Sequence, residues 1–168
     1  MTPMTIRSAR SDELAGVGAL TVGVYRAERL APEDYSPSLA DAESRARHTD
    51  VLVAVDEQDR LMGAVALVLN GGPYAELASA DDEAEFRMLA VASQARGRGV
   101  GTALIRECLA RARSAGKKRM VISTGDNMTA AHRRYEALGF SRSPDRDWSP
   151  LPGVTLLAYR LDLTVSTG

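Results

Sequence analysis

The chain has 168 residues, 45% of them hydrophobic and 26% charged, which is typical of one globular domain with its own core. The formal net charge is −1 and aromatic residues make up 5%, a balance that argues against nucleic-acid binding. A single cysteine argues against an internal disulfide, and two histidines far apart in the sequence argue against a metal site. No apolar run of about 18 residues occurs, which argues against a membrane partner. Together with the lack of a secretory signal, these features favour a cytoplasmic protein.

Hydrophobic periodicity and turn residues divide the chain into alternating helices and strands. No repeats or inter-domain linkers interrupt them, so one mixed α/β domain over residues 4–165 is expected. In chain order, the predicted elements are a strand at 5–9, a helix at 11–29 capped by Ser11, a polar helix at 38–47 capped by Ser38, strands at 51–55, 61–69 and 85–91, a helix at 100–115, a strand at 120–124, a helix at 128–138 and a strand at 154–163, with a further short strand near 140–142.

The segment between the strand at 85–91 and the helix at 100–115 is rich in glycine, and residues 96–101 read RGRGVG. A helix start offers free N–H groups and the positive end of the helix dipole, so this junction suits an anion. Glycines let a bulky diphosphate approach the backbone, and the two arginines add positive charge. The loop therefore predicts a site for a phosphate-bearing ligand. A plain tight turn with solvated arginines is the alternative reading.

Two common phosphate-binding motifs do not fit this loop. A dinucleotide-binding fold requires G-x-G-x-x-G, but Gly97 and Gly99 are followed by Thr102 where the third glycine would stand. A P-loop requires G-x-x-x-x-G-K-[ST], which occurs nowhere in the chain. The remaining pattern, R-G-x-G-x-G after a strand, resembles the acetyl-CoA pyrophosphate loop of the GNAT N-acetyltransferase superfamily.

The small net charge conceals two oppositely charged segments. Residues 1–91 carry 8 Lys and Arg against 16 Asp and Glu, whereas residues 92–147 carry 12 against 5. The basic segment contains the glycine loop, as a polyanionic ligand such as CoA would favour, and the acidic segment would favour a cationic partner such as an amine. Solvated surface charge is the alternative reading of both segments.

A second motif follows the strand at 120–124. Residues 127–140 read NMTAAHRRYEALGF, which resembles the GNAT signature N-x-x-A-x-x-x-x-Y-x-x-x-G-F. Asn127 can cap the helix or point its amide at a pantetheine arm, and Tyr135 lies about two turns further along, on the same side of the helix. Because the two motifs occur in the expected order, the resemblance extends over about residues 5–163.

The resemblance implies a single-domain GNAT-like α/β fold, with a central mixed, mostly antiparallel twisted sheet flanked by about four helices. It also implies that the sheet splays between the strands at 85–91 and 120–124, and that acetyl-CoA inserts there as a co-substrate, without a metal. The residues expected to hold acetyl-CoA are Leu89, Ala90 and Val91 on the strand, Arg96, Gly97, Arg98, Gly99, Val100, Gly101 and Thr102 in the loop and helix start, and Asn127 and Ala130 in the second motif.

The resemblance implies a direct attack by an amine on the thioester in a ternary complex, with no covalent enzyme intermediate. Tyr135 is expected to face the thioester sulfur and to donate a proton to the leaving thiolate. Glu85 resembles the base of the histone-acetylating branch. Strand alternation puts it on one face with Arg87 and Leu89, and burial there would raise the pKa of its carboxyl. An ion pair with Arg87 is the alternative role for Glu85. Weaker candidates for the base are Glu76, Asp81, Asp82 and Glu83, whose alternative role is that of solvated loop charges, and a water chain is a further alternative.

We therefore predict an acyltransferase, an N-acetyltransferase that moves an acetyl group to a primary amine of a small molecule or peptide. A protein N-terminal or lysine acetyltransferase is the nearest alternative. A non-catalytic acyl-CoA-binding sensor domain is the alternative from another class, and intact Tyr135 and Glu85 argue against it. Small enzymes of this kind often dimerise, so a homodimer is one expected assembly.

Overall fold

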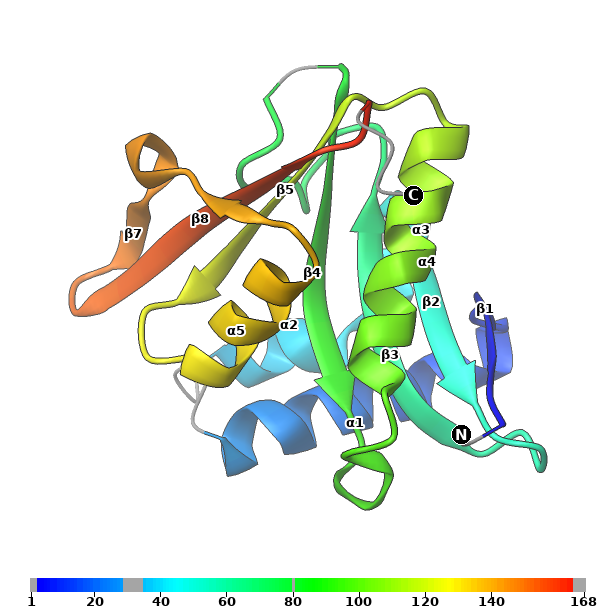
Figure 1. Ribbon diagram of the computed structural model, residues 1–168. Coiled ribbons are helices and arrows are strands. Elements are labelled where there is room, and N and C mark those ends of the chain that lie inside the picture. Colours follow the sequence, from blue (N-terminus) through cyan, green and yellow to red (C-terminus); the bar gives the residue numbers. More distant parts are fainter. Residues whose placement is uncertain (1–2, 29–34, 80, 165–168) are drawn as a thin grey trace.

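The computed structural model describes residues 3–28, 35–79 and 81–164. Within these ranges the chain forms one eight-stranded sheet, in the order β1-β2-β3-β4-β5-β8-β6 with β7 paired to β8, and five α-helices (Figure 1). The elements are β1 Thr5–Ser8, α1 Leu14–Ala27, α2 Ser36–Ala40, α3 Ala42–His48, β2 Asp50–Val55, β3 Leu61–Val68, β4 Glu83–Val91, α4 Val100–Ser114, β5 Arg119–Gly125, α5 Thr129–Ala137, β6 Ser141–Arg142, β7 Trp148–Leu151 and β8 Val154–Asp162. Parts of two predictions, the helix end at residue 29 and the domain end at residue 165, lie outside the described residues.

The two N-terminal helices begin differently from the prediction. A 3₁₀ turn over Ser11–Glu13 precedes α1, and the Glu13 carboxylate, rather than the Ser11 side chain, accepts the Arg10 N–H at 2.8 Å. The predicted polar helix is divided into α2 and α3 at Asp41, which has a non-helical backbone and accepts the Ser44 N–H at 3.0 Å. Asp41, and not Ser38, is therefore the cap. This division accounts for five helices where about four were expected.

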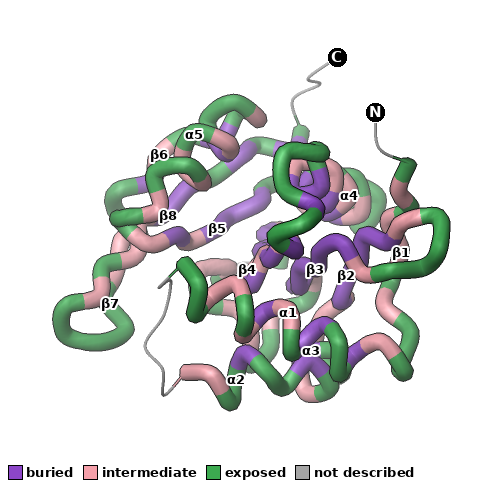
Figure 2. Tube along the Cα trace, turned by 90° about the horizontal axis from the view of Figure 1, so that it is seen from below, coloured by how far each residue is buried: buried purple, intermediate pink, exposed green. Residues whose placement is uncertain are grey.

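Helices cover both faces of the sheet. In Figure 2, α1, α2 and α3 lie on one face, and α4 and α5 lie on the other. Alternation along β2 sends Leu52 and Ala54 into the core cluster that contains the apolar stripe of α4. The same alternation sends Val51 and Val53 into the cluster that contains residues of α1. Because both faces are covered, β2 reads as a continuous apolar run rather than as an alternating one.

The sheet divides between β4 and β5. These two strands are parallel and are paired only over three positions, from Glu83 opposite Arg119 to Glu85 opposite Val121. All other neighbouring strands are antiparallel. Beyond Glu85 the two strands separate toward their C-terminal ends (Figure 1). This confirms the predicted mixed, mostly antiparallel sheet that splays between β4 and β5.

An ion-pair cluster lies at the closed end of this splay. The Glu83 carboxylate, 1% exposed, accepts hydrogen bonds from Arg146 at 2.8 Å and from Arg119 at 3.0 Å. Burial alone would raise the pKa of Glu83, but the hydrogen bonds from Arg146, from the Ser79 N–H and from Arg119 outweigh burial and lower it. The cluster therefore ties β4 and β5 to the turn that precedes β7.

Replacing Glu83 with Gln is expected to lower the free energy of unfolding at pH 7 by about 2–4 kcal/mol, because two arginines then face a neutral group. Since the folded-state pKa lies below the ordinary value of 4.5, the stabilisation is present above pH 4.5 and is lost as the pH falls through the folded value. Urea unfolding from pH 3 to 8 measures both effects. The matched control is Glu107→Gln, whose pair with Arg111 is about one-third exposed and should cost under about 0.5 kcal/mol. Equal losses in the two variants would contradict the expectation.

Of the helices in the described ranges, none is long and apolar enough to cross a bilayer.

Candidate active site

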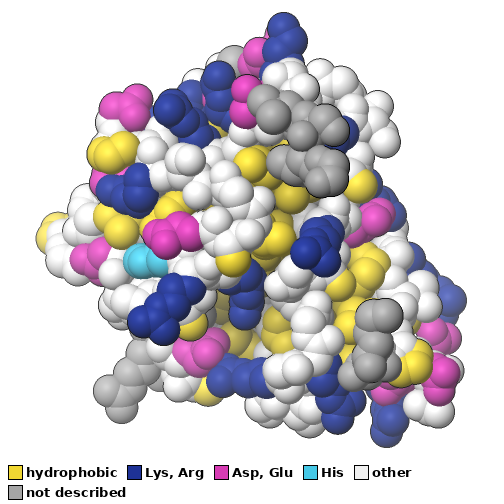
Figure 3. Space-filling model, in the orientation of Figure 1, with side chains coloured by type: hydrophobic (Ala, Val, Ile, Leu, Met, Phe, Trp, Pro, Cys, Tyr) yellow, Lys and Arg dark blue, Asp and Glu magenta, His cyan; other side chains and the backbone are white. Residues whose placement is uncertain are grey.

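A cavity of about 920 Å³ opens where β4 and β5 separate. Its walls come from β4, the glycine loop, the first turn of α4, the end of β5, α5, the β7–β8 hairpin and the end of α1. On the face shown in Figure 3, hydrophobic side chains are visible between α4 and α5, beside Lys and Arg side chains. The volume is in the range of sites for small molecules and cofactors. The predicted acetyl-CoA residues that line it are Leu89, Val91, Arg96, Gly97, Gly99, Val100, Gly101, Thr102, Asn127 and Ala130.

Two of the predicted acetyl-CoA residues do not line the cavity. Ala90 is buried and is paired with Ala64, whose side chain packs with residues of α1. Arg98 is exposed at the tip of the glycine loop. These two residues therefore do not form part of the cavity wall, although their neighbours in the sequence do.

The glycine loop presents backbone donors to the cavity. Gly97 and Gly99 adopt left-handed conformations, with φ of +77° and +78°, and Gly99 stands at the N-cap of α4. Because Gly99 has no side chain, it cannot satisfy the first N–H groups of the helix. Within the described residues, the backbone N–H groups of residues 97–102 donate to no hydrogen-bond acceptor. Six consecutive donors in the loop and the first turn of α4 can bind an anion.

Arg134 adds a positive charge to this helix start and was not predicted from the sequence. A Cβ atom on Gly101 would lie 2.7 Å from Arg134 Nη1, so the guanidinium of α5 rests directly against the first turn of α4. Both residues line the cavity. The available sequence signal was Gly101 itself, because a glycine inside a predicted helix can mark a close approach of another segment. On the other side of the loop, Arg96 Nη2 lies 2.6 Å from Glu28 Oε1.

A β-bulge changes which side chains of β4 face the cavity. Ala90 pairs with Ala64 and Arg87 pairs with Ala66, so β4 contains one more residue than β3 over this span. Met88 is at the bulge, and its φ of +57° is a left-handed conformation that is uncommon for residues other than glycine. Leu89 consequently packs in the same cluster as Phe86. The predicted alternation, with Leu89 on the face of Glu85 and Arg87, is therefore wrong from the bulge onward.

Tyr135 lies in the wall of the cavity. It is 6% exposed, and its ring packs against Phe86, Phe140 and Tyr159 with centroid separations of 5.8–6.0 Å. Burial raises the pKa of the Tyr135 hydroxyl to about 12. The phenol therefore keeps its proton at neutral pH and can act as a hydrogen-bond or proton donor.

Asn127 lines the cavity from the turn between β5 and α5. α5 begins at Thr129 with Met128 at the N-cap position, so Asn127 is not the helix cap. Because Asn127 precedes the helix, the predicted two-turn spacing to Tyr135 does not apply. Both residues nevertheless line the same cavity.

Glu85 is buried and has a raised pKa, as predicted, but its hydrogen-bond partners differ from the prediction. Its carboxylate is fully buried and does not line the cavity, and Oε1 accepts the backbone N–H groups of residues 76, 77 and 78 at 2.9–3.1 Å. Burial raises the pKa of Glu85, against the opposing effect of these hydrogen bonds. The predicted alternative, an ion pair with Arg87, is wrong, because Arg87 pairs with Glu76 instead, with Nε 3.1 Å from Oε1. Glu85 thus anchors the segment that carries Glu76.

The part of the cavity away from the glycine loop carries polar groups for which the sequence predicted no binding role, except that Glu76 was a weaker candidate for the base. Tyr25 and Tyr35 line it together with Glu76 and Arg87. Arg87 donates a hydrogen bond to the Tyr35 hydroxyl at 2.9 Å. These residues come from three separate segments, α1, the start of α2 and the β3–β4 connection with β4. No motif in the sequence links them.

Across the described ranges, no three His, Cys, Asp or Glu side chains come together as metal ligands.

Comparison with known proteins gives consistent results. The family model described as "Acetyltransferase (GNAT) family" matches residues 21–140. An uncharacterised N-acetyltransferase of Schizosaccharomyces pombe is 30% identical over 114 residues, which cover 68% of this chain and 65% of that protein. The N-acetylaspartate synthetase of Rattus norvegicus is 39% identical over 82 residues, 48% of this chain and 27% of that protein. The matched segments therefore span less than two thirds of either relative.

Among solved structures, the Salmonella typhimurium protein yncA, solved with its cofactor acetyl-CoA, superposes with a TM-score of 0.72. The alignment covers 99% of this chain and 98% of that chain at 22% sequence identity. At this level of identity the similarity establishes the fold.

Proposed function

This chain belongs to the GNAT acetyltransferase family, and on that premise we propose that it transfers the acetyl group of acetyl-CoA directly to a primary amine of a small molecule or peptide. The observation that carries the proposal is the run of free backbone N–H groups at residues 97–102, next to a cavity with a buried tyrosine. The N-acetylaspartate synthetases, whose name implies acetylation of an amino acid, support a small amine as acceptor.

In this proposal the glycine loop holds the diphosphate of acetyl-CoA. The N–H groups of residues 97–102 would donate to phosphate oxygens, and Arg134 and Arg96 would supply charge. Leu89, Val91, Asn127 and Ala130 line the cavity beyond the loop and would hold the pantetheine arm. When bound, acetyl-CoA supplies an acetyl group activated as a thioester.

The chain's own residues would perform three tasks around that thioester. The backbone of β4 at the Met88 bulge, where the regular pairing with β3 is interrupted, would donate to the carbonyl oxygen as negative charge develops. The cavity would hold the neutral amine so that its nitrogen bonds to the acetyl carbon while the carbon–sulfur bond breaks. Tyr135 would give its proton to the sulfur, and the amine would lose a proton to a base or a water chain.

For Glu85 we propose a positioning role, because its carboxylate is tied to three N–H groups outside the cavity wall. In Glu85→Gln an amide oxygen can still accept these hydrogen bonds, so kcat is expected to stay within about threefold of wild type. The pKa of Glu85 is raised in the folded state, so the free energy of unfolding of wild type decreases as the pH rises above 4.5. Glu85→Gln has no carboxyl group to ionise and avoids this decrease, so its Tm at pH 7 should not fall below that of wild type. A general base would instead contribute 100-fold or more. A loss of that size with unchanged Tm would restore Glu85 as the base.

The proposal is tested by thiol release from acetyl-CoA with a panel of amines, including free amino acids, polyamines and peptides with free N-termini or lysines. Turnover with a small amine or peptide supports it. Turnover only with folded proteins would favour the protein N-terminal or lysine acetyltransferase. Tight acetyl-CoA binding without thiol release from any amine would favour a non-catalytic sensor domain. The proposal places the enzyme in the cytoplasm, consistent with the buried free thiol of Cys108.

A further inference from the structure

The end of the cavity away from the glycine loop contains a closely held pair of opposite charges. Glu76 and Arg87 both line the cavity, with Arg87 Nε 3.1 Å from Glu76 Oε1. The two side chains are 22% and 15% exposed, so they are partly shielded from water but reachable from the cavity. A surface of this kind, with a cation beside an anion, complements a ligand that carries both charges close together.

Arg87 is held in a fixed orientation with donors to spare. Its Nη1 donates to the Tyr74 carbonyl at 3.1 Å and its Nη2 donates to the Tyr35 hydroxyl at 2.9 Å. A guanidinium has two N–H groups on each terminal nitrogen, so both nitrogens keep one that makes no hydrogen bond to a described residue. One remaining N–H group on each terminal nitrogen of a fixed planar cation provides two donors for a carboxylate.

Glu76 is fixed as firmly, but through its backbone. Its N–H donates to the buried Glu85 carboxylate, as do the next two N–H groups of the chain. Its Oε1 lies beside Arg87 and accepts a long hydrogen bond from Ser123 at 3.4 Å. No described residue donates a hydrogen bond to Oε2, which is therefore free to accept one from an ammonium or amine group.

From this arrangement we propose that the acceptor is a free α-amino acid, with its carboxylate on Arg87 and its amino group beside Glu76. The inference rests on the proposed acetyl transfer and names its acceptor class. In an α-amino acid both charged groups are attached to one carbon, so they can meet two protein charges that are in contact. Glu76 would also favour the approach of the ammonium and accept its proton before attack.

The remaining charges of the cavity argue against a polycationic acceptor. Among the described residues of the lining, Glu28 is the only acidic one besides Glu76, and it is paired with Arg96. Three arginines, Arg87, Arg96 and Arg134, line the same cavity. A polyamine would therefore meet an excess of positive charge.

The test compares acceptors that differ only at the carboxylate. Thiol release is measured with leucine, leucinamide and 3-methylbutylamine, and with phenylalanine, phenylalaninamide and 2-phenylethylamine. For wild type, kcat/KM for each amino acid should exceed that for its amide and its amine by roughly 10- to 100-fold, as expected for hydrogen bonds to a charged group. The amide distinguishes a free amino acid from a peptide N-terminus.

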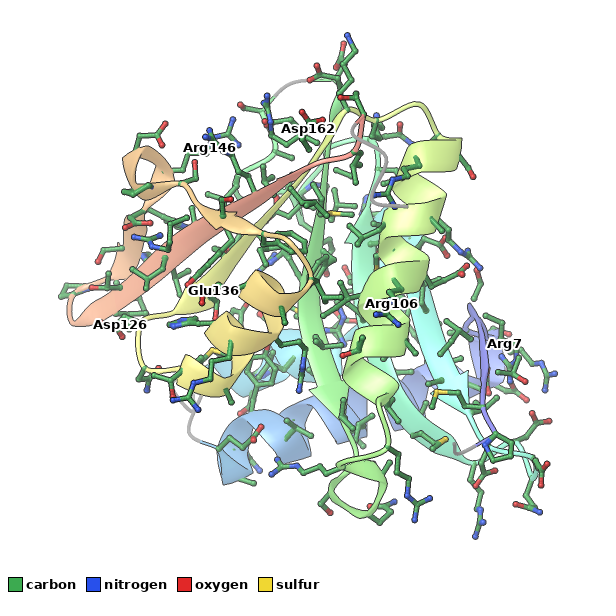
Figure 4. The ribbon with its side chains drawn as sticks, in the orientation of Figure 1. Arg7, Arg106, Asp126, Glu136, Arg146 and Asp162 are labelled. Atoms are coloured by element: carbon green, nitrogen blue, oxygen red, sulfur yellow. The ribbon has the colours of Figure 1, made fainter. Side chains whose placement is uncertain are left out.

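Variants then assign the preference to Arg87. In Arg87→Met the ratio of kcat/KM for amino acid over amine should fall to within about twofold of one, whereas the acetyl-CoA Kd should stay within twofold. Arg87→Lys, which keeps the charge without the planar pair of donors, should give an intermediate ratio and serves if Arg87→Met folds poorly. The matched control is Arg106→Met, because Arg106 is exposed on α4 outside the cavity (Figure 4) and its loss should leave the ratio unchanged.

The outcomes separate this inference from the proposed function. Equal kcat/KM for amino acid, amide and amine in wild type would overturn the amino-acid inference while supporting acetyl transfer. A preference retained in Arg87→Met would overturn the role of Arg87. No thiol release with any acceptor, despite acetyl-CoA binding, would contradict the proposed function itself.

Discussion

Replacing Gly99 with Val is expected to raise the acetyl-CoA Kd by roughly 100-fold or more, the largest effect predicted for a single change. Gly99 has φ +78° at the N-cap of α4, a conformation that a β-branched residue avoids. A Cβ atom there meets no other atom within 4 Å, so the fold itself has room for the side chain. The loop is expected to relax into another conformation and to turn N–H groups of residues 97–102 away from the cavity, losing two or more charge-assisted hydrogen bonds.

The matched control for this change is Gly71→Val. Gly71 also has a left-handed backbone, φ +68°, and a Cβ atom there also meets nothing within 4 Å, but Gly71 does not line the cavity. Both variants should lose a similar 1–2 kcal/mol of stability from backbone strain. Only Gly99→Val should lose acetyl-CoA binding in isothermal titration. A normal acetyl-CoA Kd in Gly99→Val would contradict the proposal that the loop binds the diphosphate. Equal losses of affinity in both variants would show that the effect comes from reduced stability rather than from the loop.

Replacing Tyr135 with Phe is expected to lower kcat by roughly 10- to 100-fold and to leave the acetyl-CoA Kd unchanged. Phe keeps the ring that packs against Phe86, Phe140 and Tyr159, so the wall of the cavity is preserved. Only the proton donor is removed. The expected loss lies at the lower end for general acid catalysis because a thiol of pKa about 8.5 is already a fair leaving group.

Two measurements distinguish a proton donor from a packing residue. Tyr159→Phe is the matched control, since Tyr159 is buried in the same aromatic cluster but does not line the cavity; its kcat should remain within about twofold of wild type. Because burial raises the pKa of Tyr135 to about 12, the wild-type kcat should show no loss from tyrosine ionisation between pH 7 and 10. A kcat for Tyr135→Phe equal to that of Tyr159→Phe would exclude Tyr135 as the acid.

The elements and the glycine loop were predictable because they depend on short-range physics. Apolar periodicity and turn residues predicted the strands and helices to within a few residues, apart from the division at Asp41 and the strand β7, neither of which was predicted. The glycines of RGRGVG predicted a backbone that only glycine adopts easily, and Gly97 and Gly99 have that backbone. The predicted N–H donors therefore follow from the residues of one loop and the helix after it.

The details of β4 were not predictable in the same way. Strand alternation is a local rule, and it holds only while neighbouring strands contain equal numbers of residues between pairing points. The extra residue at Met88 breaks that condition, so Leu89 changes face. Nothing in the sequence EFRMLAV marks Met88 as the bulge, because the bulge depends on how β4 meets β3.

By itself, the sequence determined the proposed donor side of this protein: a helix start with backbone N–H groups that donate to no described residue, and a second motif that leads to Tyr135. The tertiary structure alone decided the arrangement of the proposed acceptor side. The chain folds so that the N–H groups of residues 76–78 bind Glu85, and this places Glu76 against Arg87 at the cavity wall. It also brings Arg134 against Gly101. The reason is physical: a backbone conformation is set by neighbours in sequence, whereas the face that a charged side chain presents is set by the packing of distant segments.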